Sequence, residues 1–211
     1  MANRTVKDTN DAADKQSRIL LAARDEFAEK GFDGARVDRI AERAQANKQL
    51  IYYYFVNKDQ LFTRVLEEAY RDKRQQEAAL DLDRFPANEA ILQLVDFTWH
   101  YYLKNPEFIR LLNSENQLKA RHLQGLDSPV ELNKSWIGIT RSLLARGWQE
   151  KNVRENIDAM QLNINISALG FFYLINQSTL SIIYQTDLGA QPALDEHLRA
   201  MKECIAAWIR P

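Results

Sequence analysis

The sequence has few of the residues that mark several common protein classes. Its 211 residues include one cysteine, three histidines, five prolines and seven glycines. Because Cys204 has no second cysteine to pair with, an internal disulfide is excluded, and nothing suggests an oxidising compartment. The low glycine and proline counts argue against a loop-rich β architecture. A helical protein is therefore the best expectation.

Long apolar runs are also missing. The first seventeen residues are polar and mixed in charge, without the apolar core of a signal peptide. The longest apolar stretch, residues 166–175, is about half the length that a helix needs to cross a bilayer. We therefore expect a soluble, cytoplasmic protein.

The sequence shows no pattern of an enzyme or a metal site. Its histidines, His100, His122 and His197, fall in separate segments without metal-ligand spacing. No G-x-S-x-G, H-E-x-x-H, G-x-G-x-x-G or P-loop pattern is present. Cys204 lies beside Ile205 and is expected to act as a small hydrophobe rather than as a nucleophile. We therefore expect neither catalysis nor a cofactor or metal.

The overall charge gives no argument for nucleic-acid binding, but its distribution does. Lys and Arg number 28 against 29 Asp and Glu, for a net charge of -1. Residues 36–58 carry five positive and two negative charges, an excess of +3, which leaves -4 for the rest of the chain. A small basic segment on a more acidic chain is a pattern expected of a local nucleic-acid contact.

Hydrophobic spacing in the N-terminal quarter predicts three short helices. The first runs from about residue 15 and ends at Gly31, the second covers residues 36–43, and the third ends near Tyr54. Residues 44–47 form a tight turn between the second and third helices. Asn57 is a candidate N-cap for a further helix that begins at Lys58. Two short helices at a tight turn have the size of a helix-turn-helix.

The aromatic run in the third helix predicts an exposed surface. Tyr52, Tyr53 and Tyr54 are consecutive and point about 100° apart on a helix, so they cannot all enter one core. The amides of Asn47 and Gln49 stand beside them and are able to read base edges. Together with the basic residues, these side chains favour a DNA contact.

The rest of the chain predicts further helices. Residues 82–87 form a break, and three points mark helix starts: Asn105 with Pro106, Ser128 with Pro129, and Pro192. The segment from about residue 156 to 184 reads as one helix that is apolar on two faces. With the terminal helix it suits a four-helix dimer interface, and a central helix in a large monomeric bundle is the equal alternative. The predicted dimer residues are Ile164, Ala168, Phe171, Ile175, Leu198, Met201 and Ile205.

The N-terminal pattern resembles the DNA-binding domain of the tetracycline repressor (TetR) family. The resemblance is carried by Gly31-Phe32, Val37, Ile40-Ala41, residues 44–48, the run Ile51-Tyr52-Tyr53-Tyr54-Phe55 and Lys58-Asp59-Gln60-Leu61. It implies an all-α fold in which a three-helix N-terminal helix-turn-helix domain is joined by a helix to a C-terminal helical bundle that dimerises. We expect a flexible arm over 1–14, the DNA-binding domain over 15–57 and a ligand-sensing, dimerising domain over 58–211.

The resemblance also implies residue roles in DNA binding. Tyr52 is expected to bond a backbone phosphate, Lys58 to approach a phosphate and Asn47 to cap the recognition helix. The side chains expected to face the groove are Lys48, Gln49, Leu50 and Tyr53 or Tyr54.

Two positions depart from the family pattern. Gln45 occupies a turn position that usually has Gly, so we expect either that Gln45 takes an unfavourable conformation or that the turn differs slightly from that of the family. Ala35 and Arg36 replace the common Thr or Ser pair, which removes a hydroxyl cap and adds a cation near a phosphate.

By resemblance, the protein is a homodimeric repressor that a small molecule bound in the C-terminal domain releases from a palindromic operator. An activator of the same architecture, or a helical dimeric module that does not read DNA, is the alternative. The residues that could line the ligand site combine aromatic and polar side chains: Trp99, Tyr102, Arg110, Asn113, Asn116, Arg121 and Tyr173.

Overall fold

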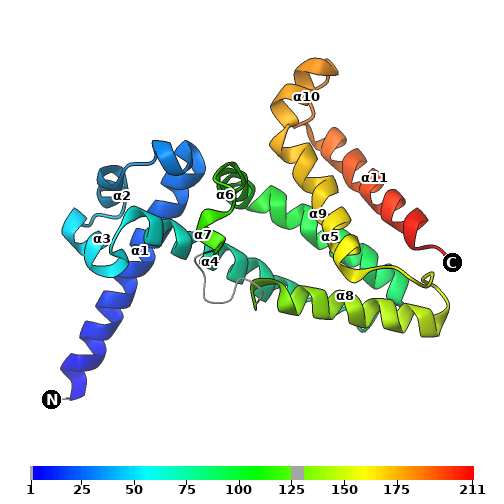
Figure 1. The fold of residues 1–211 in the computed structure, drawn as a ribbon, viewed down its shortest axis with the longest axis horizontal. Helices are drawn as coiled ribbons and strands as arrows, with labels where there is room; N and C mark the ends of the chain where they lie inside the picture. The colour runs from blue at the N-terminus through cyan, green and yellow to red at the C-terminus, as the bar shows by residue number, and fades with distance from the viewer. Residues whose placement is uncertain (1, 125–130) are drawn as a thin grey trace. The chain divides into compact units, whose positions relative to one another are not determined.

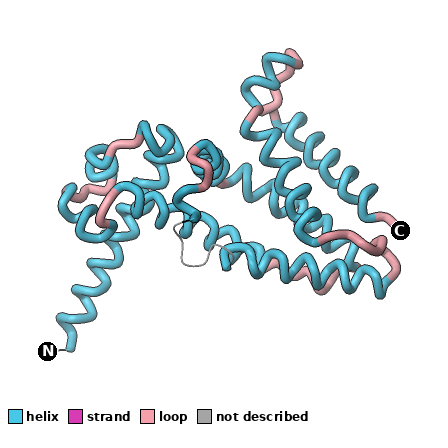
Figure 2. Tube along the Cα trace, viewed as in Figure 1, coloured by secondary structure: helices cyan, strands magenta, loops and turns pink. Residues whose placement is uncertain are grey.

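The computed structural model describes residues 2–124 and 131–211, and every regular element in these ranges is a helix (Figures 1 and 2). The all-α prediction is therefore confirmed. The helices are α1 (Ala2–Gly34), α2 (Val37–Arg43), α3 (Lys48–Phe55), α4 (Lys58–Ala78), α5 (Ala87–Lys104), α6 (Pro106–Gln117), α7 (Arg121–Gln124), α8 (Glu131–Glu150), α9 (Ala159–Ile175), α10 (Gln177–Ile183) and α11 (Gln191–Ile209).

The chain divides into two compact units. Unit 1 comprises Met1–Tyr70 and Arg110–Pro129, and unit 2 comprises Arg71–Ile109 and Val130–Pro211. This division differs from a boundary between residues 57 and 58, because the first half of α4 contributes Leu61, Phe62 and Leu66 to the core of unit 1. Helix α1 also begins at Ala2, where we predict a flexible arm. No Pro or Gly precedes Gly31 in the sequence to interrupt that helix.

Unit 1 is built around the apolar stripe of α1. Gly31 has φ of 67°, so the regular helix is interrupted there, at the residue where the sequence predicts its end. Helix α2 packs on α1, and α3 packs on α2. The buried side chains shared by these helices include Ile19, Phe27, Ile40, Ile51 and Phe55. They hold the two short helices against a longer one.

Unit 2 is a bundle in which α5 is the central helix. Helices α8, α9 and α11 all pack on α5, and α9 also contacts α8 and α11. The core includes Ile91, Leu94, Val95, Trp99 and Leu162. All four tryptophans of the sequence, Trp99, Trp136, Trp148 and Trp208, belong to this unit.

A buried ion pair lies in the C-terminal half of α4. Lys73 is 1% exposed, forms a hydrogen-bonded ion pair with Glu77 and lies 4.9 Å from the ring centroid of Trp136 in α8. Its ammonium group also lies within 5.7 Å of the ring centroids of Phe97, Tyr101 and Tyr102 in α5. Burial lowers the pKa of Lys73 to about 8 and raises the pKa of Glu77.

The predicted helix over residues 156–184 is interrupted. The structure has two helices, α9 and α10, bent by 67° at Asn176. The side-chain amide of Asn176 donates to the carbonyl of Phe172 at 2.8 Å and so caps the end of α9. Among the described residues, no single helix is both long and apolar enough to cross a membrane, although α9 and α10 together meet that length and composition.

Two of the three predicted helix starts lie among the described residues, and a helix begins at each. Pro106 begins α6 as predicted, but the side chain of Asn105 donates to the carbonyl of Tyr101 at 2.9 Å and therefore caps the end of α5 instead. Pro192 lies in the first turn of α11. The helix start predicted at Ser128 and Pro129 lies outside the described residues.

The predicted dimer residues are not all at the surface. Met201 is 1% exposed and Ile205 is 2% exposed, and both belong to the core of unit 2. Their assignment to a dimer interface is wrong, because the apolar stripe of α11 packs on α5 and α9. Ile164 and Ala168 are exposed, whereas Phe171, Ile175 and Leu198 are partly buried. Only part of the predicted set is therefore available to a second molecule.

Candidate nucleic-acid interface

The turn between α2 and α3 has the geometry of a helix-turn-helix. The amide of Ala46 donates to the carbonyl of Ala41 at 2.9 Å, which reverses the chain within residues 44–47. Gln45 has φ of 50°. The unfavourable conformation predicted for this residue is thus confirmed, because only glycine adopts positive φ without a steric penalty.

Replacing Gln45 by glycine is expected to raise the free energy of unfolding of unit 1 by about 0.5–1 kcal/mol, since relief of the backbone strain exceeds the entropic cost of glycine. Gln49→Gly is the matched control, because the same substitution inside α3 removes a helix-favouring residue and is expected to lower stability by about 1 kcal/mol. Calorimetry of both variants measures whether the free energy of unfolding rises or falls in each. A loss of stability in Gln45→Gly would contradict the interpretation.

The N-terminus of α2 is capped from another helix. Arg36 precedes α2 and makes no side-chain cap, as expected from the missing hydroxyl. Instead, its backbone amide donates to Oε1 of Glu26 in α1 at 3.3 Å, and Glu26 is fully buried. The other carboxylate oxygen of Glu26 lies 3.6 Å from Arg43. Sequence reasoning missed Glu26, because an acidic residue on a helix does not indicate a partner ten residues ahead.

Asn47 caps α3 as the resemblance implies. Its side-chain oxygen accepts a hydrogen bond from the amide of Leu50 at 2.7 Å. Leu50 is half-buried and packs against the core of unit 1, so less of its side chain is available to a groove than we predict. Asn57 is likewise an N-cap as predicted, with its oxygen accepting from the amide of Gln60 at 2.8 Å.

Helix α3 exposes the polar and aromatic face that the spacing predicts. Tyr52 is 42% exposed and Tyr53 is 79% exposed, and Gln49 is also exposed. Tyr54 is half-buried, with its ring 5.4 Å from that of Tyr53 in an edge-on contact. At least one tyrosine therefore lies outside the core, as expected.

The two lysines near α3 are both engaged by neighbouring groups. Lys48 forms an ion pair with Asp38 of α2 at 2.6 Å, and this hydrogen bond raises the pKa of Lys48. Lys58 lies 4.7 Å from the ring centroid of Phe32 and donates to the carbonyl of Asp33 at 3.4 Å. Partial burial lowers the pKa of Lys58. Arg36 adds an exposed cation at the start of α2.

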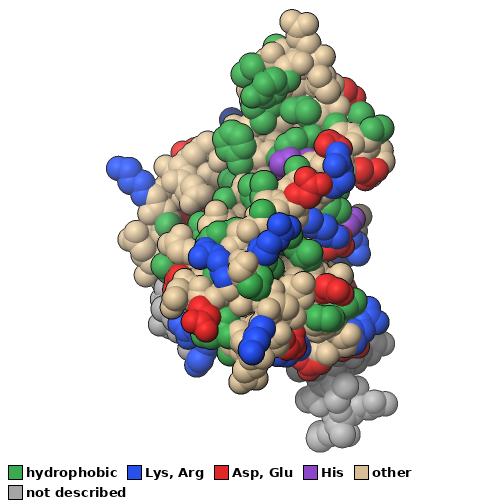
Figure 3. Space-filling model, turned by 90° about the vertical axis from the view of Figure 1, so that its right-hand side faces the viewer, with side chains coloured by type: hydrophobic (Ala, Val, Ile, Leu, Met, Phe, Trp, Pro, Cys, Tyr) green, Lys and Arg blue, Asp and Glu red, His purple; other side chains and the backbone are tan. Residues whose placement is uncertain are grey.

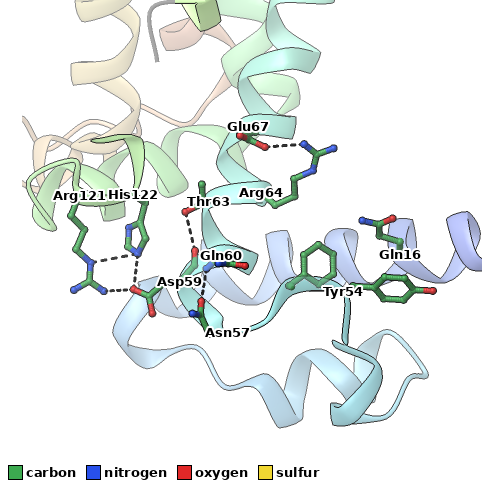
Figure 4. A pocket seen from close by; sticks show the side chains of 11 residues that line it. Gln16, Tyr54, Asn57, Asp59, Gln60, Thr63, Arg64, Glu67, Arg121 and His122 are labelled. Atoms are coloured by element: carbon green, nitrogen blue, oxygen red, sulfur yellow. Dashed lines mark hydrogen bonds and ion pairs between the residues drawn. The ribbon is translucent and has the colours of Figure 1, made fainter. Parts of the chain in front are cut away.

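A pocket of about 660 Å³ lies beside the first turn of α4, and Figure 4 shows the side chains that line it. His122 of α7 is on its wall and is 4% exposed. Arg121, which we predict as a ligand residue, instead donates to Oδ1 of Asp59 at 3.0 Å. From the sequence, His122 was seen only to lack metal-ligand spacing, and its polar partners were missed.

The predicted ligand residues fall in both units. Trp99, Tyr102 and Tyr173 are buried in unit 2, where the rings of Trp99 and Tyr173 are 5.7 Å apart. Tyr173 also stacks on His197 at 3.9 Å, a partner that the sequence did not indicate. The other four are Arg110, Asn113, Asn116 and Arg121, all in unit 1.

Comparison with known proteins explains this geometry. Residues 19–65 match the model of the bacterial regulatory proteins of the tetR family, and residues 88–205 match a tetracyclin repressor-like C-terminal domain. The chain belongs to the tetR family. The tetR-family protein is therefore a DNA-binding transcriptional regulator and not an enzyme, and the helix-turn-helix of α2 and α3 is its DNA-binding element.

Similar proteins cover nearly the whole length of this tetR-family chain. The HTH-type transcriptional repressor NicS of Pseudomonas putida is 32% identical over 195 residues, which are 92% of each chain. The regulator YdeS of Bacillus subtilis is 30% identical over 181 residues, 81% of this chain and 83% of YdeS. The structure of FadR from Bacillus subtilis in complex with stearoyl-CoA has a TM-score of 0.68 at 18% identity and covers 92% of this chain and 100% of FadR. This last likeness concerns the fold alone.

Proposed function

We propose that this protein is a homodimeric, cytoplasmic repressor that binds a palindromic operator and releases it when a small molecule binds in unit 2. The observation that carries the proposal is the exposed polar face of α3, which lies inside a strained but well-capped helix-turn-helix. An exposed Tyr and Gln on the second helix of this motif are suited to the major groove. Relatives such as NicS that are named repressors support the sign of regulation.

The proposed DNA contacts divide into two kinds. Gln49 and Tyr53 are exposed on α3 and are proposed to face base edges. The hydroxyl of the exposed Tyr52 is proposed to contact a phosphate, as are Lys58 at the start of α4 and Arg36 at the start of α2. Lys48 must leave Asp38 to reach a phosphate, so its net contribution is expected to be smaller than that of Lys58.

Lys58→Ala is expected to lower operator affinity and to reduce the slope of log K against log salt by about one, because one phosphate contact is lost. Gln49→Ala is the matched comparison and is expected to change sequence preference while leaving the salt slope intact. Fluorescence anisotropy at several salt concentrations, with operators selected from a random duplex pool, measures both. If the salt dependence of operator affinity has the same slope in Lys58→Ala as in the wild type, the proposed phosphate contact of Lys58 is wrong.

A dimer is proposed to form through the exposed face of α9. Met160 is 53%, Ile164 50% and Phe172 61% exposed, and Ala168 between them is also exposed. These four residues are spaced four apart and therefore lie on one side of the helix. Figure 3 shows hydrophobic side chains gathered in the upper part of one face of the molecule. An isologous contact would place the same stripe against itself.

The effector site is proposed to lie between α5, α8 and α9 of unit 2. Two buried polar atoms there have no hydrogen-bond partner among the described residues: Oγ1 of Thr98 in α5 and Nδ2 of Asn163 in α9. The remaining amide oxygen of Asn163 accepts from Thr140 of α8 at 2.6 Å. Unsatisfied buried polar groups are costly, so a ligand that pairs with them would be favoured. In FadR of Bacillus subtilis the ligand is stearoyl-CoA.

A gel shift with DNA from upstream of the protein's own gene, repeated with a panel of metabolites, tests the whole proposal. Binding that one metabolite abolishes is the expected result. Failure to bind every duplex at low salt would overturn DNA binding, whereas binding that no metabolite alters would overturn only the effector.

A further inference from the structure

His122 lies in a closed, aromatic environment within unit 1. Its side chain is 3% exposed, and its ring centroid is 4.7 Å from that of Phe32 and 4.8 Å from that of Phe62. Both phenylalanines belong to the core of unit 1. The ring is therefore fixed in place by packing, and only its two nitrogens have polar partners.

Glu115 of α6 binds one side of the histidine. Its carboxylate is buried, and its Oε1 accepts from the amides of His122 at 2.8 Å and Leu123 at 3.1 Å. Its Oε2 lies 2.7 Å from Nδ1 of His122, within hydrogen-bond distance. Both backbone amides donate to Oε1, so Oε2 is left for the ring, and an ionised carboxylate offers only lone pairs there. Nδ1 therefore carries a proton.

The other nitrogen faces α4. Nε2 of His122 is 3.3 Å from Oδ1 of Asp59, an oxygen that also accepts from Arg121 at 3.0 Å (Figure 4). An ionised Asp59 cannot donate, so a hydrogen bond between these atoms requires a proton on Nε2. Because Nδ1 is already protonated, only the imidazolium makes both bonds.

The neutral ring has a different partner. Without a proton on Nε2, this nitrogen becomes an acceptor, and Nε of Arg121 is 3.4 Å away to donate to it. The contact with Asp59 is then a repulsion between lone pairs. Loss of the Nε2 proton thus replaces the hydrogen bond from His122 to Asp59 of α4 by a hydrogen bond from Arg121 to His122 within α7.

The charges around His122 come from three helices. Glu115 of α6 and Asp59 of α4 are negative and touch the ring nitrogens. Arg121 of α7 and Lys58 of α4 are positive, and both lie over the neighbouring ring of Phe32, at 4.9 and 4.7 Å. Helix α1 contributes that uncharged ring.

Asp59 is the second residue of α4, directly after Lys58 and two residues after the N-cap Asn57. A bond to Asp59 therefore holds the first turn of the helix that presents Lys58. We propose that His122 is a positioning residue for DNA binding, whose imidazolium holds Asp59 and thereby places Lys58 for its phosphate. Operator affinity then falls as pH rises through the range in which histidine loses its proton. The inference rests on the proposed contact of Lys58 with DNA.

The test is operator affinity measured by anisotropy between pH 6 and 8 at constant ionic strength, with the selected operator duplex as the probe. The wild type is expected to bind about tenfold more weakly at pH 8 than at pH 6, as loss of a charge-assisted hydrogen bond implies. His122→Gln is expected to have a flat profile, since glutamine does not titrate. His100→Gln is the matched control, because His100 is exposed in unit 2, and it is expected to keep the wild-type profile.

Each outcome of the pH series either supports or overturns the proposed role of His122. Equal slopes in the wild type and His122→Gln, or a slope that only His100→Gln removes, would overturn the inference. If His122→Gln fails to fold by circular dichroism, Asp59→Asn decides instead, because Asp59 is 57% exposed and its loss leaves the bond between His122 and Glu115. A flat profile in that variant supports the inference and an unchanged slope overturns it. A flat wild-type profile overturns the inference alone, whereas a wild type that binds no duplex at any pH overturns the proposed function with it.

Discussion

Gly147→Ala is expected to lower the free energy of unfolding of unit 2 by about 3 kcal/mol, because there is no room for a methyl group at this position. A Cβ atom at residue 147 would lie 2.4 Å from Cγ2 and 2.6 Å from Cβ of Val153, and 3.3 Å from Cβ of Ala87. The turn after α8 cannot easily move away, since the carbonyl of Gly147 accepts from the amides of Asn152 and Val153 at 3.1 and 3.3 Å. The added methyl group must therefore be accommodated by shifts in the core of unit 2, which lower its stability.

Urea unfolding followed by tryptophan fluorescence measures this effect in unit 2 alone, where all four tryptophans lie. The matched control is Gly138→Ala in the same helix, where no atom of the described part of the chain lies within 4 Å of the added Cβ. This variant is expected to be more stable than the wild type by about 0.5–1 kcal/mol, because alanine favours the helix over glycine. A change of the same sign in both variants would contradict the steric argument.

Ile164→Asp is expected to convert the dimer to a monomer and to lower operator affinity by about a hundredfold or more. In an isologous interface each substitution occurs twice, so two carboxylates would be buried against apolar surface without partners. A monomer also loses the second half-site of a palindromic operator. Sedimentation velocity measures the oligomeric state, and anisotropy measures the affinity.

Leu21→Asp is the control for this substitution, since Leu21 is 55% exposed on α1 and lies in unit 1. It introduces the same charge at a similarly exposed residue and is expected to leave the dimer intact. A folded Ile164→Asp protein that remains a dimer would show that the interface lies elsewhere than on the exposed face of α9.

Features that depend on short stretches of sequence could be predicted. The helix-turn-helix, the caps at Asn47 and Asn57 and the strained conformation of Gln45 were all predicted and are all present. The Asn47 cap and the strain at Gln45 were implied by the family resemblance. The Asn57 cap and the short helices depend on contacts between residues three apart or on a spacing that a helix imposes directly. Local chemistry is sufficient to place them.

Features that depend on tertiary pairing could not be predicted. The stripe on α11 indicates burial but not the partner, so Met201 and Ile205 were assigned to a second molecule rather than to their own core. Glu26 and His122 act on residues that are distant in sequence, and His122 and Asp59 are 63 positions apart. Asn176 breaks an apolar segment because of its own side-chain hydrogen bond, which periodicity does not register. The residue roles in DNA contact remain predictions.

The buried pair of Lys73 and Glu77 restricts how α4 can slide along unit 2. A shift of one helical turn, about 5.4 Å, would carry the ammonium of Lys73 away from the rings of Tyr102 and Trp136 and leave a buried charge without its surroundings. If this face of α4 carried only apolar side chains, the helix could shift by one turn at little cost in packing energy, because one leucine would take the place of another. A buried ion pair adds little net stability. We therefore infer that this pair specifies a single packing register of the C-terminal half of α4 against α5 and α8.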